Sequence, residues 1–104
     1  MTQNNQDFTI SAGYYESIQA EISDVSPGEI TSAEWYLKGL HGVDLISKPD
    51  VVVGFDCTTH ETVVIFELPS EDTVGLRKGD YYHICEAMVD GIKVCLFSGI
   101  CTVE

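Results

Sequence analysis

A cysteine and a histidine that could act together stand three residues apart at Cys57 and His60. This C-x-x-H spacing would supply two of the four ligands of a structural zinc site, and Cys95 and Cys101 could add two soft ligands. The chain has no C-x-x-C pair, however, and a polar connection between strands also explains Cys57 and His60. We therefore predict no bound metal and no other cofactor.

Carboxylates offer a second kind of metal chemistry. Asp44, Asp50 and Asp56 fall in predicted loops or strand ends, where they could bind calcium. Their spacing matches no calcium-binding loop, so calcium is the less favoured alternative. The adjacent carboxylates of Glu71 and Asp72 precede a predicted turn and are expected to be solvated.

A cysteine nucleophile would need a neighbouring histidine and a third group that orients the histidine. His83 lies two residues before Cys85, so on an extended strand both point to the same face, which we predict to be the core. His41 lies between Gly39 and Gly42, which fit no phosphate-binding glycine motif. Because no polar groups converge, we predict that the chain is not an enzyme.

Composition limits what such a chain can bind. Its 104 residues suffice for one domain, and its 44% hydrophobic and 21% charged residues are ordinary for a globular fold. Five Lys and Arg against 17 Asp and Glu give a formal net charge of -12, which argues against nucleic acid and anionic membranes as partners. No apolar run reaches the roughly 20 residues of a membrane-spanning helix. The polar N-terminus is not typical of a secretion signal.

Short alternating segments separated by glycine and proline predict an all-β chain. The predicted strands are 8–11, 15–24, 31–37, 43–46, 51–55, 62–68, 81–89 and 92–103. Their spacing and the chain length favour an immunoglobulin-like antiparallel β-sandwich of seven to eight strands. We expect residues 1–7 to form a flexible N-terminal arm and residues 8–104 a single domain.

The dipeptide Asp90-Gly91, flanked by alternating apolar residues, predicts a tight hairpin. A strict alternation from this turn gives one apolar face, whose pairs are Val89 with Ile92, Ala87 with Val94, Cys85 with Leu96, His83 with Ser98, and Tyr81 with Ile100. The opposite face is mixed, and its predicted pairs are Met88 with Lys93, Glu86 with Cys95, Ile84 with Phe97, and Tyr82 with Gly99. The first face is the predicted core side.

The mixed face is more apolar than exposure to solvent alone requires, which is typical of an interface. The residues predicted to form a protein interface are Tyr82, Ile84, Met88, Phe97 and Cys101. On this interpretation, Ile84→Lys or Phe97→Glu would leave the domain folded and disrupt its docking.

The predicted core contains the chain's one tryptophan, at the place where sandwich folds carry a central tryptophan. The core residues are Trp35, Phe66, Leu68, Tyr81, Cys85, Val94 and Leu96. Gly79, two residues before Tyr81, predicts a tyrosine corner, in which the phenol hydroxyl bonds back to the preceding turn.

The four cysteines are predicted to be free thiols in a reducing compartment. Alternation sends Cys85 and Cys95 to opposite faces, and Cys95 and Cys101 lie about 20 Å apart on one extended strand. Neither pair can then form a disulfide. A disulfide between Cys57 and Cys85 remains an alternative.

Turn and core residues also carry a resemblance to a known module. They are Val64, Phe66, Leu68, Glu71-Asp72-Thr73, Leu76, Gly79, Tyr81, Asp90-Gly91, Ser98-Gly99, Thr102-Val103 and the opening Phe8-Thr9-Ile10-Ser11-x-Gly13. This pattern resembles immunoglobulin-like β-sandwich domains of tailed-phage virion proteins, similar to the N-terminal domain of the baseplate upper protein family. The resemblance implies a scaffold without catalytic residues.

The resemblance implies a non-enzymatic structural component of a bacteriophage virion, associated with capsid, neck, tail or baseplate. Such a protein is synthesised in the host cytoplasm and acts by protein–protein docking during assembly. Its partners would be other virion proteins, with a homo-oligomer as an alternative. The alternative function is that of a small acidic inhibitor, encoded by phage or host, that binds one cellular protein.

Overall fold

The computed structural model describes residues 4–22, 25–39, 44–48, 51–58 and 60–104. Within these residues the chain forms nine strands, one 3-10 turn and one short helix. In order they are β1 (Asn4–Asn5), β2 (Phe8–Ile10), β3 (Glu16–Ile22), η1 (Pro27–Glu29), β4 (Ile30–Lys38), β5 (Asp44–Lys48), β6 (Val52–Asp56), β7 (Glu61–Leu68), α1 (Ser70–Thr73), β8 (Gly79–Val89) and β9 (Ile92–Val103). All eight predicted strands are present, although Asp24 and Val43, at the predicted ends of two of them, lie outside the described residues.

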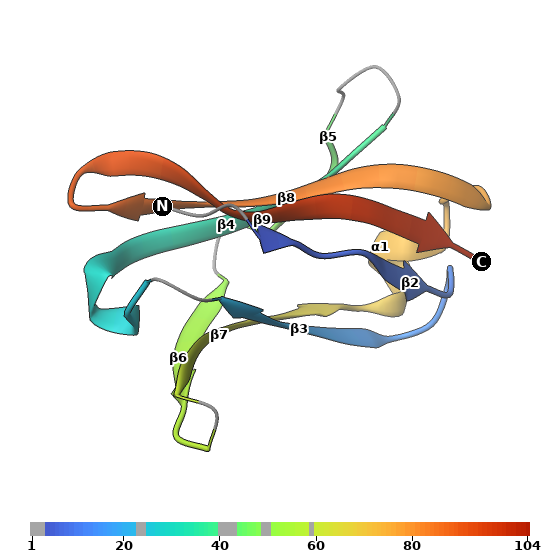
Figure 1. Cartoon of the computed structure of the whole chain (residues 1–104). Coiled ribbons are helices and arrows are strands. Elements are labelled where there is room, and N and C mark those ends of the chain that lie inside the picture. The colour runs from blue at the N-terminus through green and yellow to red at the C-terminus, as the bar shows by residue number, and fades with distance from the viewer. Residues whose placement is uncertain (1–3, 23–24, 40–43, 49–50, 59) are drawn as a thin grey trace.

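The strands form two sheets that pack face to face (Figure 1). The large sheet has the order β1-β9-β8-β4-β5, with β2 also paired to β9, and the small sheet has the order β3-β7-β6. The predicted all-β sandwich is confirmed. The order is immunoglobulin-like, because β9, β8, β4 and β5 take the places of strands G, F, C and C′, opposite β3, β7 and β6 in the places of B, E and D.

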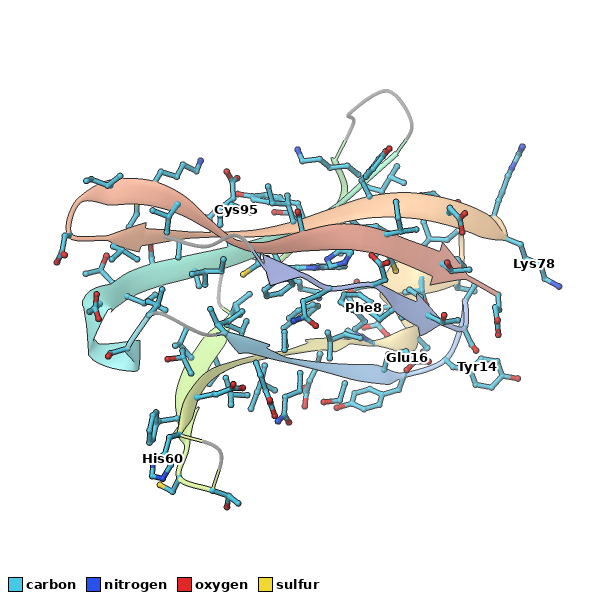
Figure 2. All side chains as sticks on the ribbon, viewed as in Figure 1. Phe8, Tyr14, Glu16, His60, Lys78 and Cys95 are labelled. Atoms are coloured by element: carbon cyan, nitrogen blue, oxygen red, sulfur yellow. The ribbon has the colours of Figure 1, made fainter. Side chains whose placement is uncertain are left out.

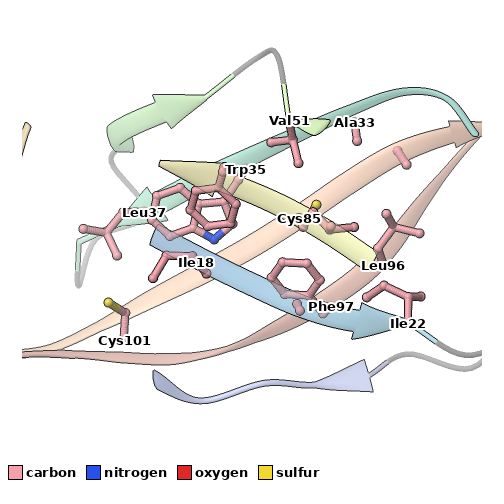
Figure 3. Close-up of a cluster of buried hydrophobic side chains, with 14 of the residues drawn as sticks. Ile18, Ile22, Ala33, Trp35, Leu37, Val51, Cys85, Leu96, Phe97 and Cys101 are labelled. Carbon is pink, nitrogen blue, oxygen red and sulfur yellow. The ribbon is translucent and has the colours of Figure 1, made fainter. Parts of the chain in front are cut away.

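The core lies between the sheets and is built by period-two alternation on their facing sides (Figure 3). On β3 the buried residues are Ile18, Ala20 and Ile22, and the residues between them are exposed. Trp35 is fully buried on β4, and its ring stacks on Phe66 of β7 with the ring centroids 4.5 Å apart. The predicted core residues Trp35, Phe66, Leu68, Cys85 and Leu96 are buried, and Tyr81 and Val94 pack against them.

The β8–β9 hairpin turns where the sequence predicts it. Asp90 and Gly91 have φ values of 51° and 77°. Two positive φ angles are what a type I′ turn requires, and its twist matches that of the flanking strands. From Val89 opposite Ile92 to Glu86 opposite Cys95, the cross-strand pairs are the predicted ones.

Beyond Cys95 the register shifts by one residue at a β-bulge. Cys85 pairs with Phe97 instead of Leu96, and Tyr81 pairs with Cys101 instead of Ile100. A bulge places two residues of one strand opposite one residue of the other. The alternation of β9 is therefore reversed after Leu96, and the later residues exchange faces.

This shift corrects the predicted exposure of two interface residues. Phe97 and Cys101 were predicted to lie on the outer, mixed face, but both are fully buried in the core. Ser98 and Ile100 take their places on the outer face. The prediction failed because it continued a strict alternation through a strand that contains one extra residue.

Residues 4–7 of the predicted flexible arm are bound to the large sheet. Asn4 and Asn5 pair in parallel with Phe97 and Ser98. The backbone N–H of Gln6 donates to the carbonyl oxygen of Ser98 at 2.8 Å, and Asp7 Oδ1 accepts from the N–H of Ile100 at 2.8 Å. The polar composition of this segment suggested an arm, but the segment is held by backbone hydrogen bonds and by the Asp7 carboxylate.

Gly99 permits this close approach of the N-terminal segment. A Cβ atom at Gly99 would overlap the carbonyl oxygen of Gln6 and lie 2.8 Å from its carbonyl carbon. We expect Gly99→Ala to detach residues 4–7 and to lower the free energy of unfolding by about 1–3 kcal/mol through lost hydrogen bonds and local overpacking. Hydrogen exchange of the Gln6 amide should rise in the variant. Unchanged protection would contradict the prediction.

The predicted tyrosine corner is present at the start of β8. Tyr81 Oη donates to the carbonyl oxygen of Arg77 at 2.7 Å. Just upstream, the unpredicted helix α1 places a buried residue, Thr73, whose hydroxyl accepts from the N–H of Gly13 at 3.0 Å. No helix among the described residues is long and apolar enough to cross a membrane.

Candidate protein-binding surface

The outer side of the large sheet faces away from β3, β7 and β6, and the described elements place no second layer over it (Figure 1). Residues paired across antiparallel strands share a face. The resulting rows are Ser32–Met88–Lys93, Glu34–Glu86–Cys95, Tyr36–Ile84–Ser98 and Lys38–Tyr82–Ile100. We call these twelve residues the large-sheet face.

The large-sheet face brings together three of the five predicted interface residues. Tyr82 is 55% exposed, and Ile84 and Met88 are partly exposed on the same side of β8. The structure adds Tyr36 and Ile100, which the sequence reasoning missed. The burial of Trp35 could have indicated Tyr36, since neighbours on a strand point to opposite faces.

The centre of the large-sheet face is apolar and its margins are charged. Tyr36, Ile84, Tyr82 and Ile100 occupy two adjacent rows. Lys38 Nζ lies 5.5 Å from the centroid of the Tyr36 ring, a cation–π distance. An apolar centre with a polar rim is the usual anatomy of a protein interface.

One end of this face is a shallow hollow of about 100 Å³. Its lining residues are Ser32, Glu34, Glu86, Ala87, Met88 and Lys93. Glu34 and Glu86 pair directly across β4 and β8, and Lys93 Nζ lies 3.7 Å from Glu86 Oε1. Figure 2 shows Cys95, in the same row as the two glutamates, on the side of the sheet turned away from the core.

His83, the histidine nearest to Cys85 in the sequence, has both of its ring nitrogens hydrogen-bonded in the interior. The Trp35 indole N–H donates to Nδ1 at 3.3 Å, and Nε2 is hydrogen-bonded to the carbonyl oxygen of Gln6. Because an indole N–H can only donate, Nδ1 is the unprotonated nitrogen and Nε2–H is the donor. The ring packs on Phe8, with centroids 4.2 Å apart, and Phe8 lies between the sheets in Figure 2. His83 therefore links the N-terminal segment to the core.

The structure describes all four cysteines, and none of them forms a disulfide. Burial raises the pKa of the Cys85 thiol to about 12 and that of Cys101 to about 11, so both stay protonated at neutral pH. A thiol needs its thiolate form to act as a nucleophile. Cys57, which is exposed, and Cys85, which is buried, are both free thiols, so the alternative pairing of these two residues is not formed.

The candidate metal ligands do not gather in the described part of the chain. No group of three or more His, Cys, Asp or Glu side chains there could hold a metal ion. Cys57 and His60 are exposed near the turn between β6 and β7, and Figure 2 shows His60 at the tip of that turn. Asp72 forms an ion pair with Lys48. His41 and Asp50 lie outside the described residues.

Comparison with known proteins assigns the chain to no family. No protein-family model matches it, and no curated protein matches its sequence. The likeness to phage immunoglobulin-like modules stays a prediction that depends on the turn and core residues named for it, whereas the fold class follows from the order of the strands.

Proposed function

We propose that the chain is a non-enzymatic docking module that binds another protein through the large-sheet face, as a structural component of a phage particle. The observation that carries the proposal is the apolar centre of that face, where Tyr82 is 55% exposed beside Ile84 and Ile100. An apolar centre on an uncovered sheet is better explained by a partner than by solvent. The assignment to a virion derives from the resemblance alone.

A charge placed at the centre of the face tests the docking role. We expect Ile84→Lys to leave the domain folded, because Ile84 is partly exposed on an outer face. Incorporation into particles should fall to background, since an unpaired lysine would be buried at the interface. Mass spectrometry of purified particles measures copies per particle, and circular dichroism reports the fold. Ser17→Lys, an exposed change of the same charge on β3 of the small sheet, is the matched control.

Stoichiometry separates the virion proposal from the alternative of an acidic inhibitor. A virion component is present in purified particles at a fixed copy number set by particle symmetry. An inhibitor is absent from particles and co-purifies with one cellular protein. Recovery of the chain only in the particle-free fraction, bound to a single host protein, would replace the first proposal with the second.

A further inference from the structure

We propose that β6 is an open edge onto which an extended, basic segment of a partner protein adds as a fourth strand of the small sheet. This surface lies on a different sheet from the large-sheet face. The inference therefore does not depend on the function proposed above, and the two can be tested separately.

Among the described strands, β6 pairs with β7 alone and forms one edge of the small sheet. An edge strand presents unpaired N–H and C=O groups along its free side. Natural edges are usually protected by lysine, proline or inward-pointing charge. From Val52 to Phe55 the edge contains none of these, and Val52 and Phe55 are 62% and 51% exposed.

Two other edges carry more polar residues. On β3, the opposite edge of the small sheet, apolar residues alternate with exposed Ser17, Gln19 and Glu21. On β5, the edge of the large sheet, the strand ends in Lys48, which is paired with Asp72. The contrast makes β6 better suited to strand addition than β3 or β5.

A shallow hollow of about 360 Å³ lies beside this edge on the outer side of the small sheet. It is lined by Gln19, Gly54, Phe55, Cys57, Val63 and Ile65. Gly54 contributes no side chain, and nothing lies within 4 Å of where its Cβ would be. In an added strand every second side chain points to this side, so one aliphatic side chain can occupy the hollow.

Charge identifies the chemistry of the added strand. The three strands of the small sheet contain no Lys or Arg, and their five carboxylates are Glu16, Glu21, Asp56, Glu61 and Glu67. Asp56 and Glu61 are partners in the β6–β7 register, so two acidic residues stand at this end of the small sheet. A second copy of β6 would add one more carboxylate and no cation, whereas a basic strand would neutralise the acidic sheet. The occupant is therefore a basic segment with apolar residues between its charges.

The probe for this site is the peptide Lys-Val-Lys-Val-Lys-Val-Lys, added to the uniformly ¹⁵N-labelled full chain. We expect amide shift changes confined to residues 52–56 and to the lining of the hollow, together with backbone NOEs between the peptide and β6. Raising the salt from about 50 to about 500 mM should weaken binding, because screening reduces attraction between exposed charges. The peptide Glu-Val-Glu-Val-Glu-Val-Glu should bind at least about tenfold more weakly, a difference of about 1.4 kcal/mol.

Two variants locate the binding site. Gly54→Val should fold normally, since the added side chain meets open space, and should weaken binding about tenfold by filling the hollow. Glu61→Lys should weaken binding more than Glu71→Lys, which makes the same change of charge in α1. Ile84→Lys should bind the peptide like the wild type.

Several results would overturn the inference. The first two are the absence of binding of the basic peptide and equal binding of the acidic peptide. The third is a set of amide shift changes on the large sheet instead of on β6. The fourth is an equal loss of binding in Glu61→Lys and Glu71→Lys, which would show a response to net charge alone. A concentration-dependent dimer held through β6 would assign the edge to a second copy.

Discussion

Phe97→Glu is expected to leave the chain unfolded. Phe97 is fully buried, and its ring centroid lies 5.7 Å from that of His83. Loss of a buried phenylalanine costs about 3–5 kcal/mol. Burial of a carboxylate adds several kcal/mol more. The sum is comparable to the total stability of a typical domain, about 5–15 kcal/mol. Far-UV circular dichroism and amide NMR dispersion will report the loss of structure.

The matched variant for this test is Phe97→Leu, which should fold with a smaller loss of stability because the site stays apolar. Ile84→Lys, which puts a charge on the opposite side of the same hairpin, should also fold. A folded Phe97→Glu protein would mean that the bulge at Leu96 does not exist in solution and that Phe97 lies on the outer face, as strict alternation predicts.

Acidification is expected to destabilise the domain through His83. Burial lowers the pKa of His83 below its ordinary value of 6.5, although the hydrogen bond to Gln6 and the charge of Asp7 oppose the shift. The folded state therefore favours the neutral ring, whereas the unfolded chain binds a proton as the pH falls below about 6.5. The stability is fully present above that pH and decreases as the pH falls towards the folded-state pKa.

Between the two pKa values the free energy of unfolding should fall by up to about 1.4 kcal/mol per pH unit. Protonation places a hydrogen on Nδ1, which then faces the Trp35 indole N–H, so a donor meets a donor. Urea unfolding followed by circular dichroism at about pH 7.5, 6.5 and 5.5 measures the slope above the range in which most carboxylates titrate.

His83→Gln is the control for the pH experiment. Its amide can accept from the Trp35 indole and donate to the Gln6 carbonyl, but it does not titrate. We expect this variant to lose most of the pH dependence above about pH 5. If the stability of the variant depends on pH as steeply as that of the wild type, other groups cause the effect. If the stability of the wild type does not change with pH in this range, His83 keeps an ordinary pKa.

The elements of the fold could be predicted because their signals are local. Period-two alternation marks β3 and β7, and Asp90-Gly91 marks the hairpin. Gly79 and Tyr81 mark the corner at the start of β8, where the expected hydrogen bond is present. In each case the deciding residues lie within a few positions of one another, so the sequence shows them together.

The bulge was missed although the sequence contains a signal for it. In β9, Val94 and Leu96 stand at even positions and Phe97, Cys101 and Val103 at odd positions, with Ile100 as the exception. A change of parity inside one strand indicates an inserted residue. The β9 residues of the candidate interface were assigned from odd and even positions along the strand. The one inserted residue at the bulge is therefore the reason that Phe97 and Cys101 were placed on the wrong face.

The environment of His83 could not be predicted, because its partners are remote in the chain. Trp35 lies 48 residues away and Gln6 lies 77 residues away. Pairing of Asn4 and Asn5 with β9 was also hidden, since it uses backbone groups that every residue carries. These contacts form only when strands that are distant in the sequence lie side by side in the folded sheet.

The parallel pairing of β2 with β9 has a mechanical consequence. Phe8, Thr9 and Ile10 lie beside Cys101, Thr102 and Val103, so the first and last segments of the domain run side by side in the same direction. Tension applied to the two chain ends pulls these strands past each other along their length. Their hydrogen bonds are then loaded in shear and must break together, whereas an antiparallel hairpin pulled at its open end unzips bond by bond. A pull between these two segments therefore has to break several hydrogen bonds at once.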